Sequence, residues 1–207
     1  MADLAVNGEE IRMELNQMNL DQIISNSSEM KLLEKRMVFL SEAVNSGVAR
    51  RLVNHLLALD AESDKPIYMF INSPGGEVNS GFSIYDTMRF LNSEVRVITT
   101  GLCASIATII NLGAPKQHRY SMPNSHFLIH QPLIGGHIQG QASDLEITAK
   151  EILKTRKKLN ELLAKECGQS FERIEEDTTR DYWMTASEAA EYGLISKVIS
   201  KMTDIKN

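Results

Sequence analysis

The chain has 207 residues, of which 43% are hydrophobic and 24% are charged, and its formal net charge is −5. This length fits one domain with a real hydrophobic core, and an acidic balance without a dense Lys/Arg block argues against a nucleic-acid groove. No run approaches the ~18 apolar residues that a membrane span needs, and the two cysteines, Cys103 and Cys167, fit neither a disulfide framework nor a zinc spacing.

Residues 1–33 are polar with scattered methionines, and the pattern becomes regular only after residue 35. Short apolar runs there predict strands, and apolar residues at helical spacing predict helices. The alternation of the two predicts an α/β fold with mostly parallel strands covered by helices. In chain order, strands are predicted over 37–40, 66–71, 95–99 (ended by Gly101), 126–129 and 194–199, and helices over 44–59, 80–91, 104–112 and 143–167.

The helix predicted over 143–167 is longer than a crossover between parallel strands requires. Ser143 and Glu146 form an S-x-x-E pattern that is typical of a capping box at its start, and Gly168 stands just past its end. We therefore expect this helix to project from the body of the domain and to mediate assembly.

Three polar residues lie at positions where α/β proteins often carry catalytic side chains. Ser105 lies between a strand and a helix, beside unpaired backbone N–H groups, and fits a nucleophile as well as a plain N-cap serine. His130 follows the strand over 126–129 and fits a general base or a satisfied core histidine. Asp181 precedes two aromatic residues and fits either a carboxylate that orients an imidazole or a cap. The residues alone leave these alternatives open.

The segment Asn72-Ser-Pro-Gly-Gly76 follows a predicted strand. It offers a tight turn with free N–H groups for an oxyanion hole, although Pro-Gly-Gly is also ordinary in turns. Together, these segments resemble the proteolytic subunit of the ATP-dependent Clp protease. The resemblance covers about residues 35–200. It is carried, in order, by the segments 70–76, 81–87, 101–105, 123–132, 139–142, 177–181 and 187–193.

The resemblance implies the α/β crotonase-like spiral of ββα units, with a projecting handle helix over about 143–167. It implies an N-terminal arm over 1–33 in the axial gating region and one Clp-type peptidase domain over 34–207, in which the handle spans 134–167. It further implies two stacked seven-membered rings in the cytoplasm, fed with unfolded polypeptide by a hexameric AAA+ unfoldase that consumes ATP. This chain has no G-x-x-x-x-G-K-[ST] of its own.

By position, the resemblance implies Ser105 as nucleophile, His130 as general base and acid, and Asp181, in preference to Asp177, as the residue that orients the imidazole. The implied activity is that of a serine endopeptidase without a metal or organic cofactor. The resemblance also assigns the backbone N–H groups of Gly76 and Ile106 to the oxyanion hole. It assigns Tyr68, Phe70 and Phe90 to an apolar pocket for unfoldase docking. Contacts between the rings are assigned to Arg180 and Gln141.

Four features depart from the family pattern. The arm lacks the usual apolar stretch, the segment 133–140 is about two residues longer, Thr179 replaces an acidic residue, and Ala107 replaces a glycine. They suggest a divergent paralogue that joins a second Clp proteolytic subunit in a mixed particle. One alternative is therefore a mainly structural or regulatory subunit with weak activity. Another, ranked lower because it needs no serine–histidine pair, is an acyl-CoA enzyme of the crotonase superfamily.

Overall fold

The computed structural model describes residues 28–133 and 141–205. The chain divides into two units, residues 1–37 and residues 38–207. In the first unit, residues 28–34 are helical, and Arg36 has a left-handed φ of 60° in the turn that follows. Most of the expected N-terminal arm, residues 1–33, lies outside the described residues, as does most of the handle segment that precedes the long helix.

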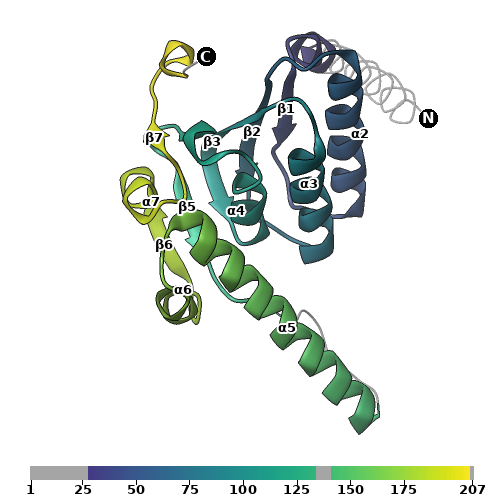
Figure 1. Ribbon diagram of the computed structural model, residues 1–207, viewed down its shortest axis with the longest axis vertical. Coiled ribbons are helices and arrows are strands. Elements are labelled where there is room, and N and C mark those ends of the chain that lie inside the picture. The colour runs from purple at the N-terminus through teal and green to yellow at the C-terminus, as the bar shows by residue number, and fades with distance from the viewer. Residues whose placement is uncertain (1–27, 134–140, 206–207) are drawn as a thin grey trace, which may run out of the picture. The chain divides into compact units, whose positions relative to one another are not determined.

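The described residues of the second unit are built on one sheet, whose first strand begins at the unit boundary (Figure 1). The strand order is β1-β2-β3-β4-β7, while β5 pairs with β3 and β6 pairs with β5. The pairs β2–β3, β3–β4, β3–β5 and β4–β7 are parallel, and β5–β6 is antiparallel. The prediction of mostly parallel strands is therefore confirmed. The strands are β1 Met37–Leu40, β2 Ile67–Ser73, β3 Val95–Ala104, β4 Arg119–Ser121, β5 His126–Ile129, β6 Tyr182–Thr185 and β7 Lys197–Val198.

Apolar periodicity explains why the helices pack on this sheet. In the first long helix of the second unit, Leu52, Leu56 and Leu59 fall on one face and are buried, and the Asn45 side chain caps its start by accepting from the Val48 N–H at 3.0 Å. Burial of such a face supplies most of a helix's stability. The helices are α2 Ser46–Glu62, α3 Val78–Phe90, α4 Ile106–Asn111, α5 Ala142–Cys167, α6 Phe171–Asp177 and α7 Ala186–Tyr192, with short 3₁₀ turns at Lys116–His118 and Met202–Asp204.

The prediction that Gly101 ends a strand at residue 99 is wrong, because β3 continues to Ala104. The side chain of Asn72 accepts a hydrogen bond from the Leu102 N–H at 3.0 Å. A Cβ at Gly101 would lie 2.7 Å from Asn72 Oδ1, closer than real atoms approach. The glycine therefore makes room for the Asn72 side chain within the strand, and the longer strand carries the chain directly to Ser105.

The long helix α5 has the predicted end but a different start. Gly168 closes it in a left-handed conformation with φ of 72°, as expected, and donates its N–H to the Ala164 carbonyl. The helix begins at Ala142 after Gln141, whose side chain makes no capping bond, so Ser143 lies inside the first turn and the predicted capping box is wrong.

Only the second half of α5 contributes buried residues, namely Leu159, Asn160, Leu163 and Cys167. The first half carries large apolar side chains in the open, with Ile147 exposed by 60% and Leu153 by 61%. In Figure 1 this half extends beyond the sheet, so the expected projecting helix is confirmed.

Candidate active site

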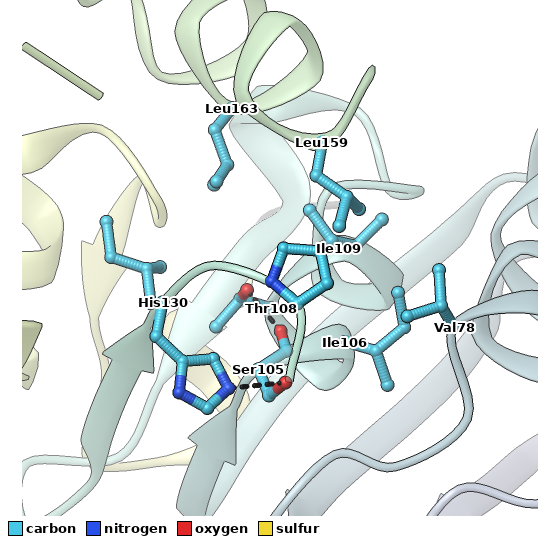
Figure 2. A pocket seen from close by; sticks show the side chains of 10 residues that line it. Val78, Ser105, Ile106, Thr108, Ile109, His130, Leu159 and Leu163 are labelled. Carbon is cyan, nitrogen blue, oxygen red and sulfur yellow. Dashed lines mark hydrogen bonds between the residues drawn. The ribbon is translucent and has the colours of Figure 1, made fainter. Parts of the chain in front are cut away.

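Ser105 occupies the turn between β3 and α4. Its backbone has φ of 56° and ψ of −126°, an unusual conformation for a residue with a side chain, and its N–H donates to the Leu128 carbonyl of the neighbouring strand β5. Its hydroxyl makes no capping bond to α4. Instead, Ser105 Oγ lies 2.9 Å from His130 Nε2 (Figure 2). The structure therefore does not support a plain N-cap serine at this position.

The antiparallel pairing of β5 with β6 brings His130 to Asp181. The register pairs Ile129 with Tyr182, and its continuation by one residue places His130 opposite Asp181. His130 Nδ1 lies 2.9 Å from Asp181 Oδ1. A hydrogen-bonded chain of serine, imidazole and carboxylate results, although its members are 25 and 51 residues apart in sequence.

Hydrogen bonds just beyond this pair hold the two segments together. The Gln131 N–H donates to the Thr178 carbonyl at 2.7 Å, and Gln131 Nε2 donates to the Thr179 carbonyl at 2.9 Å. These bonds fix the end of β5 against the segment that carries Asp181. The supporting role of Gln131 could not be predicted from the sequence, because it depends on the pairing of two distant segments.

The histidine and the aspartate differ in their access to water. The His130 side chain is 13% exposed, whereas the Asp181 side chain is 62% exposed. The Asp181 carboxylate can accept the Nδ1–H of the imidazole and leave Nε2 directed at Ser105.

Asp177, the other aspartate of this segment, is engaged elsewhere. Asp177 Oδ2 accepts a hydrogen bond from the Tyr192 hydroxyl at 2.7 Å and lies 3.6 Å from Arg173 Nε. Burial, together with the hydrogen bond to Asp177, raises the pKa of Tyr192 above its ordinary value. Of the two aspartates, Asp181 is thus the one that contacts the imidazole.

The turn after β2 lies against the Ser105 backbone. Gly75 has φ of 87°, and a Cβ on it would meet Ser105 Cβ at 2.7 Å and the Ile106 nitrogen at 3.1 Å. Val44 holds the turn from the other side by donating its N–H to the Gly75 carbonyl at 2.8 Å. Within residues 28–133 and 141–205, the N–H groups of Gly76 and Ile106 have no hydrogen-bond partner. Two free donors therefore lie near the serine.

An apolar pocket opens beside Ser105 and His130 (Figure 2). Its cavity volume is about 20 Å³, and it is open to solvent. Its apolar walls were not predictable as a pocket from the sequence. The signal available was the four-residue spacing of Leu159 and Leu163 on an amphipathic helix, which predicts burial but not the residues they pack against. The pocket is lined by Val78, Ser105, Ile106, Thr108, Ile109, Ile129, His130, Pro132, Leu159 and Leu163.

The residues assigned to unfoldase docking are only partly brought together. Tyr68 and Phe70 lie on the same face of β2, half-buried against a cluster that includes Ile98 and Tyr120. Phe39 stacks on Phe70 with ring centroids 5.1 Å apart. Phe90, at the end of α3, is 81% exposed, and no aromatic ring contacts it in the described part of the chain.

The two residues assigned to ring contacts, Arg180 and Gln141, are exposed. In the described ranges, no cluster of His, Cys, Asp and Glu side chains could hold a metal ion. No helix of those ranges is long and apolar enough to cross a membrane.

Most of the chain matches known proteins. A family model described as Clp protease matches residues 21–202. The chain is 51% identical over 167 residues to the ATP-dependent Clp protease proteolytic subunit 3 of Synechococcus sp. (strain CC9605), which covers 80% of this chain and 83% of that protein. It is 46% identical over 177 residues to the ATP-dependent Clp protease proteolytic subunit of Ligilactobacillus salivarius (strain UCC118), with coverage of 85% and 89%.

The solved structures agree with this result. A ClpP1 mutant from Listeria monocytogenes matches with a TM-score of 0.79 and 38% identity, covering 86% of this chain and 98% of that one. The crotonase-like fold expected from the resemblance is therefore confirmed. The chain belongs to the Clp protease family of serine peptidases.

Proposed function

We propose that this subunit is a serine endopeptidase in which Ser105 is the nucleophile, His130 the general base and acid, and Asp181 the residue that orients the imidazole. The observation that carries the proposal is the hydrogen-bonded chain through these three side chains, with both links at 2.9 Å. These distances lie within the reach that a general base needs.

The reaction would begin with attack of Ser105 Oγ on a peptide carbonyl. His130 Nε2 takes the hydroxyl proton and then delivers it to the leaving amine, which departs as an acyl-enzyme forms on Ser105. Water, deprotonated by the same nitrogen, hydrolyses that ester and restores the serine. The Asp181 carboxylate accepts the Nδ1–H throughout and stabilises the imidazolium that forms.

The charge that develops on the carbonyl oxygen needs donors, and the N–H groups of Gly76 and Ile106 can supply them. Both are without partners among the described residues, and Gly75 packs directly against the Ser105 turn. Fixed backbone donors stabilise an oxyanion without reorganisation during the reaction. The Ile106 N–H also lies at the N-terminus of α4, where the helix dipole favours negative charge.

The pocket beside Ser105 supports a preference for an apolar side chain at the residue that precedes the scissile bond. Its walls include Val78, Ile109, Leu159 and Leu163, and its polar groups belong mainly to the catalytic chain and to Thr108. Burial of an apolar side chain there is favourable by about 1.5–3 kcal/mol, whereas a charged side chain would lose its hydration without a partner.

The proposed assembly is two stacked seven-membered rings that enclose the active sites. The exposed apolar residues of α5, such as Ile147 and Leu153, favour its burial by another copy of the chain. Arg180 and Gln141, both exposed, are proposed to lie at the contact between rings. A hexameric ATP-dependent AAA+ unfoldase would deliver unfolded chains and dock on the apolar surface of Tyr68, Phe70 and Phe90.

We propose that this peptidase is located in the cytoplasm, a reducing compartment in which the two free cysteines stay unpaired.

The hydrogen bonds that link Ser105, His130 and Asp181 favour an active subunit over a purely structural one. Peptide hydrolysis by the purified chain, alone and mixed with a second Clp proteolytic subunit, tests this choice. The proposal requires that Ser105→Ala removes this subunit's share of hydrolysis while the oligomer persists in size-exclusion chromatography. Undiminished hydrolysis would refute it.

A further inference from the structure

Two leucines of α5 form one wall of the apolar pocket. Leu159 and Leu163, four residues apart, share one face of the helix and stand across from the residues of α3 and α4 (Figure 2). On α3, Val78 lines the same pocket. Helices α5 and α3 therefore both contribute walls to this pocket.

Lys158, the residue directly before Leu159, joins α5 to α3. Its Nζ lies 4.0 Å from the centroid of the Phe82 ring. Phe82 is one helical turn beyond Val78 on α3, and its ring meets Tyr85 edge-on with centroids 6.3 Å apart. This cation–π contact thus links Lys158, directly beside the pocket residue Leu159, to Phe82, one turn from the pocket residue Val78.

Glu166, one turn beyond Leu163, fixes the other end of the wall. Its carboxylate pairs with the Arg119 guanidinium, and Arg89 Nη1 of α3 approaches within 3.7 Å. Arg119 is fully buried and also donates to the Leu112 carbonyl, at the end of α4, at 3.1 Å. This end ties the wall to both α3 and the helix that begins beside Ser105.

We propose that Lys158 is a specificity-determining positioning residue. Its contact with Phe82 sets the width of the pocket and so the size of the apolar side chain accepted before the scissile bond. This inference rests on the function proposed above and adds to it the selection of substrate by size. Lys158 acts through Leu159 and Val78 and does not touch the substrate.

The contacts that hold α5 at Glu166 are stronger than the contact at Lys158, so a substitution at Lys158 can shift the nearby part of the helix more easily. Arg119 has several partners and no access to water, so the Glu166 end cannot yield without breaking a buried ion pair. Lys158 is exposed and Phe82 half-buried, and a cation–π contact at such a site is weak. Loss of that contact should therefore widen the pocket at Leu159 while the fold persists.

The test compares Lys158→Met, which keeps the length of the side chain and removes its charge, with the conservative Lys158→Arg. Lys157→Met is the matched control, because Lys157 is adjacent, exposed and paired only with Glu161 at 3.7 Å among the described residues. Fluorogenic peptides that differ only at the residue before the scissile bond, tryptophan or leucine, give a ratio of kcat/KM values for each assembled variant.

For Lys158→Met we expect the ratio of kcat/KM for the tryptophan peptide to kcat/KM for the leucine peptide to rise about 2- to 5-fold. This factor corresponds to the free energy of an exposed cation–π contact. Lys158→Arg and Lys157→Met should keep the wild-type ratio, and all variants should react with a fluorophosphonate at the wild-type rate. An unchanged ratio in Lys158→Met, an equal shift in Lys157→Met, or a uniform loss on both peptides would overturn the proposal. Failure of the proposed function is a separate result, namely hydrolysis that persists in Ser105→Ala.

Discussion

A single methyl group at Gly75 should disable the active site while the chain still folds. In Gly75→Ala the new Cβ would lie 2.7 Å from Ser105 Cβ and 2.5 Å from the Ala104 carbonyl oxygen. Carbon atoms prefer separations of about 3.5–4.0 Å, so the Ser105 turn must move by roughly 1 Å. A displacement of that size at a reacting group costs on the order of 10²-fold in rate. We therefore expect kcat/KM for a fluorogenic peptide to fall about 100-fold.

Gly168→Ala is the matched control for backbone strain. Gly168 is also left-handed, with φ of 72°, but a Cβ there would meet only Lys116 Nζ, at 3.9 Å. Both substitutions should cost about 1–2 kcal/mol of unfolding free energy from the left-handed backbone, and Gly75→Ala somewhat more because of its contacts. Gly168→Ala should keep its activity. Wild-type kcat/KM in Gly75→Ala, or equal losses of activity in both variants, would show that a Cβ at Gly75 does not act by displacing the Ser105 turn.

Three other predictions follow from side-chain environments. Asp181→Asn presents an amide in place of the acceptor for the imidazole Nδ1–H, so kcat should fall on the order of 10⁴-fold with unchanged thermal unfolding. The backbone N–H of Ser93 lowers the pKa of Asp60, so the ionised carboxylate stabilises the fold above its ordinary pKa and loses that effect as pH falls through the folded value. The unfolding free energy of Asp60→Asn should therefore be lower than that of the wild type at pH 7, and the difference should shrink as the pH falls through the folded pKa of Asp60. Burial raises the pKa of Cys103 and of Cys167 to about 12, so mass spectrometry should find both unmodified by iodoacetamide at pH 8 until the chain is unfolded.

The parts of the fold that follow local periodicity were predictable from the sequence. The strand β2 alternates its buried residues, and α2 and α5 repeat theirs at helical spacing, so their existence and approximate bounds were correct. Short elements were missed, namely β4, α6, β6 and α7, because three to seven residues carry too little periodic signal. The predicted strand over 194–199 shrinks to Lys197–Val198, because the N–H groups of Leu194 and Ile195 donate back to the Ala189 carbonyl of α7.

The members of the candidate site could be named from sequence, but their convergence could not. Local context favoured a helix-capping role for Ser105, and family resemblance was needed to single it out as a nucleophile. What joins His130 to Asp181 is the register of an antiparallel pair, which depends on tertiary packing across 51 residues of separation. The walls of the pocket could not be predicted either. The sequence indicates that a leucine of α5 is buried, but the residues it packs against depend on how the helices are arranged in the fold.

Peptide mapping after reaction with a fluorophosphonate tests most directly whether Ser105 is a nucleophile activated by His130. We expect one adduct per wild-type subunit, located on Ser105, no adduct in Ser105→Ala, and labelling at least 100-fold slower in His130→Ala. An adduct on any other residue, or equal labelling rates with and without His130, would contradict it.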